Sequence, residues 1–164
     1  MVTASTTVLQ AGINTSVEQQ NLDHWFLDKQ GKLLAWREWR VSLDGLDNTE
    51  LYGKVAIWWK FVPLVNKKFD PWRQETWPNP WELVGDGSFC PSAQGLGIFY
   101  TLALLGKDCE LMLAIVDKEP RLMALLPNKQ LLNYYVGEVV DIDNVEMQIL
   151  KTWAPSDLAR LVKV

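Results

Sequence analysis

Cys90 is the residue in this sequence whose type and position could support nucleophilic chemistry. It is followed by Pro91 and by an apolar stretch with helical spacing that ends at Gly106. Proline suits the first position of a helix because the N–H that it lacks would have no partner there, so Cys90 is predicted to be the N-cap. A thiol at a helix N-terminus faces partial positive charge and free N–H groups, which favour the thiolate. The pattern therefore predicts a candidate nucleophile at the head of a buried helix.

The proton acceptor that such a thiol requires is hard to find in the sequence. Imidazole suits both removal of the thiol proton and protonation of the leaving group. The only histidine is His24, which lies far upstream of Cys90 and beside Trp25 and Phe26. A histidine in that setting is more often a packed or surface side chain. One alternative is that His24 reaches Cys90 in the folded chain and acts as the base. The position of His24 beside two aromatic residues instead favours a thiol without a catalytic partner.

The stretch around Cys90 resembles the core of transglutaminase-like and papain-like thiol enzymes. In PWELVGDGSFCPSAQGLGIFYTLALLGKDCELMLAIV, a Trp–Glu–Leu turn and a glycine-rich loop lead to the Cys helix, and a glycine ends the helix before an apolar strand. The resemblance covers about residues 70–145. It implies an α+β fold in which a central buried helix packs on a small antiparallel β-sheet.

The same resemblance implies which positions would act in an active enzyme. The nucleophile corresponds to Cys90, the base to a histidine on the strand around DKEPRLMAL, and the acid behind that base to Asp141 or Asp143. No histidine occurs in that strand. An active site would have to combine Cys90, His24 and Asp141, and the sequence predicts instead that the protein is not an enzyme and has no catalytic residues.

Other chemistries lack their residue patterns. The triplet GLG at 95–97 lies inside a predicted helix rather than between a strand and a helix, so no dinucleotide-binding loop is expected. Cys90 and Cys109 are the only cysteines, too few for a zinc site or a disulfide framework. We expect no cofactor and no metal. The net charge of −4 argues against nucleic-acid binding, and no apolar run reaches the roughly 18 residues that span a membrane.

The N-terminal third is predicted to hold an arm, a hairpin and a helix. Residues 1–20 are rich in Ser, Thr, Gln and Asn, which predicts an extended arm ahead of a single α+β domain at 21–164. Residues 25–43 predict a β-hairpin, because a DKQG turn precedes tryptophans that alternate with charged residues. A helix is predicted from about residue 49 to 62, capped by Asn48 or Thr49.

The rest of the chain is predicted to hold the central helix and the sheet. Gly95 and Gly97 in the Cys90 helix suggest that another backbone packs closely there. Residues 109–119 and 120–130 predict two strands, residues 131–142 one or two more with Gly137 at a bend, and the tail a short helix capped by Ser156.

Nine tryptophans are the anomaly of the composition, and three of them punctuate the proline-rich connector at residues 67–83. Tryptophan is enriched at the energetic centres of interfaces. The connector is either a loop that its indoles anchor to the core or a binding strip. The residues predicted to contact a protein partner are Trp72, Trp77, Trp81, Lys67, Lys68 and Arg73.

Together these patterns predict a non-catalytic structural or assembly protein. The connector FDPWRQETWPNPWEL also resembles small proteins of tailed bacteriophages that infect cyanobacteria. That resemblance implies a virion component of the neck, tail or baseplate, folded in the host cytoplasm, with other virion subunits or further copies of itself as partners. A Cys-dependent amidase, peptidase or acyltransferase, a Trp-rich ligand-binding module and a cytoplasmic location are the alternatives.

Overall fold

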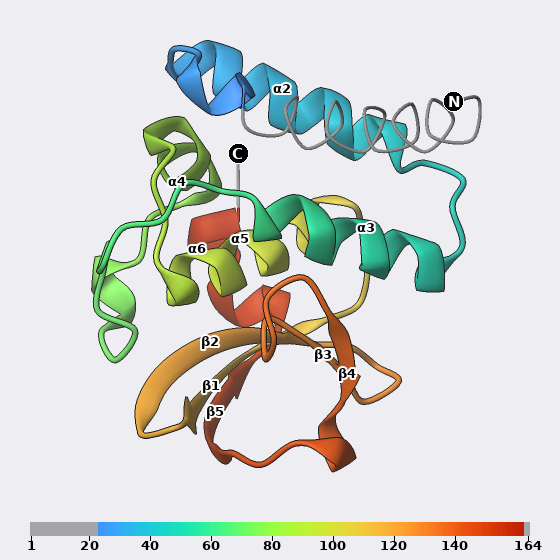
Figure 1. Cartoon of the computed structure of the whole chain (residues 1–164), viewed down its shortest axis with the longest axis vertical. Coiled ribbons are helices and arrows are strands. Elements are labelled where there is room, and N and C mark those ends of the chain that lie inside the picture. The colour runs from blue at the N-terminus through green and yellow to red at the C-terminus, as the bar shows by residue number, and fades with distance from the viewer. Residues whose placement is uncertain (1–22, 163–164) are drawn as a thin grey trace, which may run out of the picture.

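A computed structural model describes residues 23–162 and shows an α+β architecture, with a layer of helices on one face of an antiparallel sheet (Figure 1). The predicted fold class is therefore confirmed, whereas the predicted arm at 1–20 lies outside the described residues. Within residues 23–162, no helix is both long and apolar enough to cross a membrane. The helices are η1 His24–Phe26, α2 Lys29–Ser42, α3 Asn48–Lys60, η2 Gln74–Thr76, α4 Pro80–Asp86, α5 Pro91–Leu104, η3 Ile142–Asn144, η4 Pro155–Leu158 and α6 Ala159–Val162.

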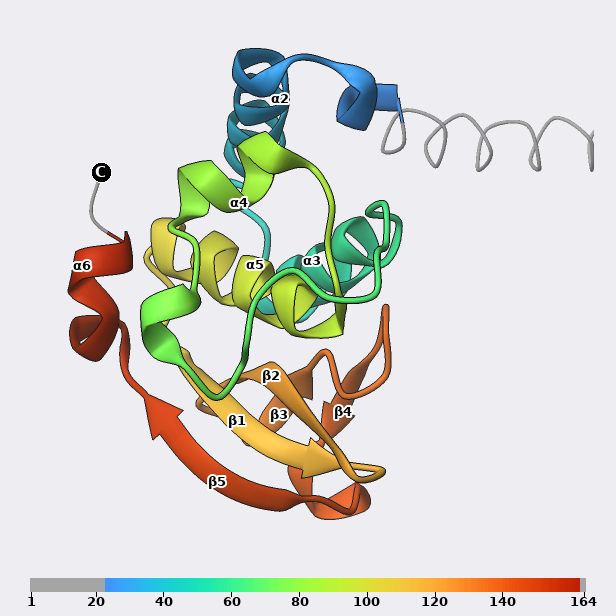
Figure 2. The ribbon, with the colours of Figure 1, turned by 90° about the vertical axis from the view of Figure 1, so that its left-hand side faces the viewer.

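The central helix is α5, which begins at Pro91 with Cys90 as its N-cap, as predicted. Its residues from 92 to 102 are all buried, because α5 lies between the sheet and the other helices (Figure 2). A Cβ on Gly95 would lie 1.9 Å from the carbonyl oxygen of Leu122 in the sheet. The predicted close approach of another backbone is confirmed at Gly95, whereas Gly97 faces the indole of Trp59 instead. The helix ends before Gly106, whose φ of 74° is left-handed as expected for such a terminus.

The hairpin predicted at residues 25–43 is wrong, because this stretch forms η1 and the helix α2. Asp28 is the N-cap of α2, and its carboxylate accepts a hydrogen bond of 2.8 Å from the Gly31 N–H. Aspartate is favoured at caps as well as turns, so the DKQG stretch is locally ambiguous. Trp36 decides the outcome, since in the helix its side chain is fully buried and its Nε1 donates to Thr101 of α5.

Two further helices differ from the expectation in instructive ways. α3 confirms the helix predicted near residues 49–62, but its cap is Asp47 rather than Asn48 or Thr49. α4 was missed because its proline-rich sequence resembles a loop. Asn79 and Glu82 form a reciprocal capping box there, and Pro80 occupies the first position of the helix.

The sheet has the strand order β4-β3-β2-β1-β5, and every neighbouring pair is antiparallel. Asp117 and Lys118 join β1 to β2 with φ of 50° and 70°, the left-handed pair of a tight hairpin turn. The first four strands confirm the prediction, and the left-handed Gly137 lies at the predicted bend. The strands are β1 Glu110–Val116, β2 Glu119–Leu125, β3 Gln130–Leu132, β4 Val139–Asp141 and β5 Gln148–Trp153.

The C-terminal part adds one strand that the sequence analysis missed and one cap that it misplaced. β5 pairs with β1 and forms an edge of the sheet, as Figure 2 shows. The tail is helical, as predicted, in η4 and α6. Ser156 is not its cap, because the Asp157 carboxylate accepts a 2.8 Å hydrogen bond from the Ala154 N–H instead.

Candidate functional site

The thiol of Cys90 lies at a pocket of about 400 Å³ where three segments meet. Cys90 itself is only 4% exposed, and its side chain makes no capping hydrogen bond. The head of α5 forms one wall, the start of β2 a second, and the loop between α3 and α4 a third. The lining residues are Asn66, Lys67, Phe69, Asp70, Pro71, Trp72, Cys90, Pro91, Ser92, Glu119, Pro120 and Arg121.

The first residues of β2 belong to the stretch in which the resemblance to thiol enzymes implied a catalytic histidine. They are Glu119, Pro120 and Arg121, and all three line the pocket with Cys90. The Arg121 side chain offers only N–H donors and no acceptor, so it cannot remove a thiol proton. Its Nη1 donates a 2.6 Å hydrogen bond to the carbonyl oxygen of Tyr134, which fixes it to the neighbouring segment. The pocket that Cys90 lines therefore contains a fixed arginine side chain and no histidine.

His24 is the first residue of η1 and does not line this pocket. Its ring stacks on Trp58 of α3, with centroids 5.1 Å apart, and lies 4.3 Å from the ring of Trp25. Both indoles are buried. This packed aromatic cluster is the structural setting of the only imidazole in the chain.

The two candidate acids also lie elsewhere in the fold. Asp141 ends the edge strand β4, where it is exposed and pairs in register with Gln130. Asp143 is an exposed residue of η3. Neither lines the pocket at Cys90. The set of Cys90, His24 and Asp141 that an active enzyme would need is thus not assembled around the pocket.

Asn133 is the polar residue that does reach the head of α5, and the sequence analysis did not find it. Its amide nitrogen donates to the carbonyl oxygens of Pro91 at 2.8 Å and Leu122 at 3.0 Å. The side chain is 3% exposed, and the backbone has a left-handed φ of 80°. Because asparagine tolerates that conformation better than most residues, it can join α5 to the sheet from a turn after β3. The only sequence signal was an asparagine in an otherwise apolar run.

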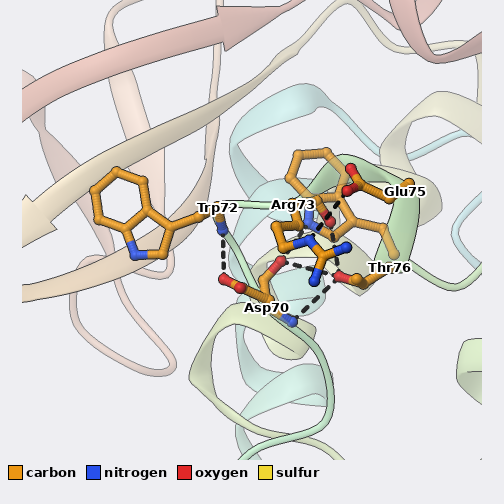
Figure 3. A network of polar contacts seen from close by, with 6 residues as sticks. Asp70, Trp72, Arg73, Glu75 and Thr76 are labelled. Carbon is orange, nitrogen blue, oxygen red and sulfur yellow. Dashed lines mark hydrogen bonds and ion pairs between the residues drawn. The ribbon is translucent and has the colours of Figure 1, made fainter.

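Trp72 is held at the rim of the pocket by a hydrogen-bonded loop (Figure 3). The Asp70 carboxylate accepts a 2.9 Å hydrogen bond from the Trp72 N–H. Thr76 Oγ1 accepts from the Asp70 N–H at 3.2 Å and lies 2.7 Å from the carbonyl oxygen of Arg73. Glu75 pairs with Arg73, with 3.0 Å between Oε1 and Nε. The loop therefore fixes the backbone of Trp72 while its indole remains 56% exposed.

The six residues predicted for partner binding do not form one surface. Trp72 and Lys67 line the pocket, and Arg73 lies in the Trp72 loop. Trp77 is only 4% exposed and packs on Trp153, so it belongs to the core.

Trp81 and Lys68 have structural roles as well. Trp81 is half-buried, with its ring 5.9 Å from that of Trp36. Lys68 forms an ion pair with Asp86, which lowers the pKa of that carboxyl group. The interpretation of the connector as a loop anchored by its indoles therefore holds for Trp77 and Trp81.

The second cysteine has a different environment. Cys109 is buried, and loss of solvent together with the nearby charges of Asp108 and Glu110 raises its pKa to about 12. Both cysteines are free thiols. In the part of the chain that the structure describes, no group of three or more His, Cys, Asp or Glu side chains could hold a metal ion.

Comparison with solved structures defines the class of fold. No family model and no curated protein matches the sequence. The chain is similar in structure to LapG of Legionella pneumophila, with a TM-score of 0.66, 12% identity, and 91% of this chain and 95% of that chain covered. It is also similar to calcium-bound LapG, with a TM-score of 0.64, 13% identity, and 86% and 87% covered. The chain therefore has a LapG-like, transglutaminase-like fold, which confirms the resemblance seen around Cys90 at the level of fold.

Proposed function

We propose that this chain is a non-catalytic assembly protein that binds a protein partner across the rim of the Cys90 pocket. The observation that carries the proposal is the residue content of that pocket: Glu119, Pro120 and Arg121 line it together with Cys90, and no histidine does. A scaffold of the thiol-enzyme type thus keeps its cysteine without an imidazole to shuttle its proton.

The chemical argument against catalysis rests on proton transfer. A thiol nucleophile needs a group that takes its proton and then delivers one to the leaving group, with a pKa near the working pH. Arg121 has no acceptor, and Glu119 is exposed to solvent. Pro91 also lacks the backbone N–H that the first helical residue would otherwise offer to an oxyanion.

The argument for a partner rests on Trp72. An exposed indole on a loop that is already hydrogen-bonded loses little conformational freedom when it binds, which favours affinity. Lys67 and Pro71 line the same pocket as Trp72. Tryptophan is enriched at the centre of protein interfaces, and a polar rim that remains accessible to solvent surrounds such a centre. Trp72 therefore suits the centre of the contact and Lys67 its rim.

The resemblance of the connector to tailed-phage proteins suggests a particular form of this role. We propose a component of the neck, tail or baseplate of a virion, which folds in the host cytoplasm and binds other virion subunits. Such a component needs a stable fold and a specific contact surface, and it needs no turnover.

Thiol reactivity tests the non-catalytic part of the proposal. Alkylation of Cys90 by iodoacetamide at neutral pH, followed by peptide mass spectrometry that separates Cys90 from Cys109, is expected to be no faster than for an ordinary buried thiol. His24→Ala should leave the rate unchanged. Fast alkylation that His24→Ala abolishes would instead establish an active thiol enzyme.

Crosslinking tests the binding part. A photo-crosslinking amino acid at position 72 should capture one defined protein in cells that produce this chain with its natural partners, whereas the same group at the similarly exposed Tyr135 should not. Trp72→Ala is expected to weaken that contact by about 2 kcal/mol, with the fold unchanged. Equal capture from both positions, or a Trp72→Ala variant that binds as well as the parent, would contradict the assigned surface.

A further inference from the structure

The outer face of α2 carries an apolar stripe that stays exposed among the described residues. Leu27 precedes the helix, and Leu34 and Val41 follow at intervals of seven residues, with exposed fractions of 48%, 54% and 67%. Seven residues make about two helical turns, so Leu34 and Val41 lie along one line of the helix. Leu27 lies ahead of the helix in extended backbone. Its side chain covers the first turn, where a Cβ on Gly31 would lie 2.9 Å from the Leu27 Cβ. Trp36, which anchors α2 to the core, lies on the opposite side.

The position of α2 leaves this stripe accessible. In Figures 1 and 2, α2 lies at the margin of the described part of the molecule, with α4 beneath it. The principal packing partners of α2 are α4 and η1. Large apolar side chains in a row on a surface mark a site of association, whereas a single exposed one does not.

We propose that a second copy of this chain binds here, with the two α2 helices parallel about a twofold axis. Each copy would then pack Leu27, Leu34 and Val41 against the same residues of the other. A twofold interface is self-complementary, so one stripe supplies both sides. The inference deepens the proposed assembly role, on which it rests, by naming one partner and one surface.

Charge decides the orientation of the two helices. At 100° per residue, Arg37 and Glu38 lie on opposite flanks of the stripe and only one residue apart along the axis. The two ion pairs found among the described residues, Lys68–Asp86 and Arg73–Glu75, involve neither of them. In a parallel twofold pair, opposite flanks meet, so Arg37 of each copy lies beside Glu38 of the other. In an antiparallel pair equal flanks meet, and this complementarity is lost.

The size of the stripe indicates how tightly the copies would bind. Three apolar layers bury less than the roughly 1,200 Å² typical of stable complexes, so the isolated dimer is expected to be weak. In an assembly that already holds the copies close together, a weak contact suffices because the effective concentration is high.

Analytical ultracentrifugation of the full-length chain over concentrations up to about 1 mM tests the proposal. We expect reversible dimerisation, with Leu34→Asp raising the dissociation constant about tenfold or more. Ile149→Asp is the matched control, because Ile149 is 50% exposed but lies on β5. Circular dichroism should show both variants folded.

Variants that reverse the charges of Arg37 and Glu38 supply a second test of the parallel arrangement, and both residues are exposed. Arg37→Glu and Glu38→Arg should each weaken the dimer, and the double exchange should restore it, because it rebuilds both ion pairs with reversed signs. A chain that stays monomeric at every concentration, or a dimer that ignores Leu34→Asp, overturns the proposal. A dimer that Leu34→Asp weakens but that ignores the charge exchanges overturns the parallel arrangement. These measurements do not involve Cys90 or Trp72, so their failure is distinguishable from failure of the pocket proposal.

Discussion

Thr101 on α5 is expected to be a disproportionately important residue for stability, because one hydroxyl group serves two buried indoles. Trp36 Nε1 donates to Thr101 Oγ1 at 3.2 Å and Trp59 Nε1 donates to it at 3.0 Å, from α2 and α3 respectively. The hydroxyl itself donates to the carbonyl oxygen of Gly97 at 2.8 Å. Both indoles and Thr101 are at most 1% exposed, so water cannot replace a lost partner.

The substitution Thr101→Val removes the hydroxyl while keeping the shape of the side chain. Each buried donor left without an acceptor costs about 1–3 kcal/mol. Two indole N–H groups therefore predict a loss of about 4 kcal/mol in the free energy of unfolding, a large share of the roughly 5–15 kcal/mol of a typical domain. Thr101→Ser keeps the acceptor and removes one methyl group, which predicts a loss of about 1 kcal/mol.

Urea denaturation followed by far-UV circular dichroism measures both variants, with linear extrapolation to zero denaturant. A double-mutant cycle adds a sharper test. Because Trp36→Phe removes one of the two donors, Thr101→Val should cost less in that background than in the parent chain. Equal losses for Thr101→Val and Thr101→Ser, or strict additivity in the cycle, would refute the shared-acceptor reasoning.

Two further predictions concern α5 and the second thiol. Gly95→Ala should destabilise the fold although alanine has the higher helix propensity, since its Cβ would lie 1.9 Å from the Leu122 oxygen. Thermal melting measures this, with Ala93→Gly as a helix control. An unchanged or raised melting temperature for Gly95→Ala would contradict the close packing. Cys109, with a pKa of about 12, should stay almost entirely protonated at pH 8. Its alkylation in the native chain should therefore be slow at pH 8 and should accelerate as the pH rises, because the thiolate is the reactive form. An alkylation rate that levels off near pH 8 would rule out the raised pKa.

Local sequence signals were sufficient where the physical preference acts within a few residues. Cys90 and Pro91 predicted the start of α5, because proline fits only where a helical N–H needs no partner. Gly106 predicted its end, since the left-handed backbone there costs glycine little. The resemblance to thiol enzymes, rather than a local signal, implied that the strand around 117–125 belongs to the site, and Glu119, Pro120 and Arg121 of that stretch line the pocket with Cys90.

Tertiary packing decided what local signals left ambiguous. Asp28 suits a turn as well as a helix cap, and α2 forms because Trp36 finds a buried acceptor on α5. Trp72 and Trp77 lie in the same proline-rich stretch, yet one indole is 56% exposed and the other 4%.

The sequence by itself thus determined the α+β class, the central thiol helix and the absence of a histidine beside it in the chain. The tertiary structure alone decided which indoles are core and which remain exposed. It also decided that Arg121 lines the Cys90 pocket while His24 does not, and that Asn133 joins α5 to the sheet. The physical reason is the separation along the chain of the residues that interact. Caps and turns depend on backbone geometry over a few residues, whereas burial and site composition depend on contacts between segments that only the folded chain brings together.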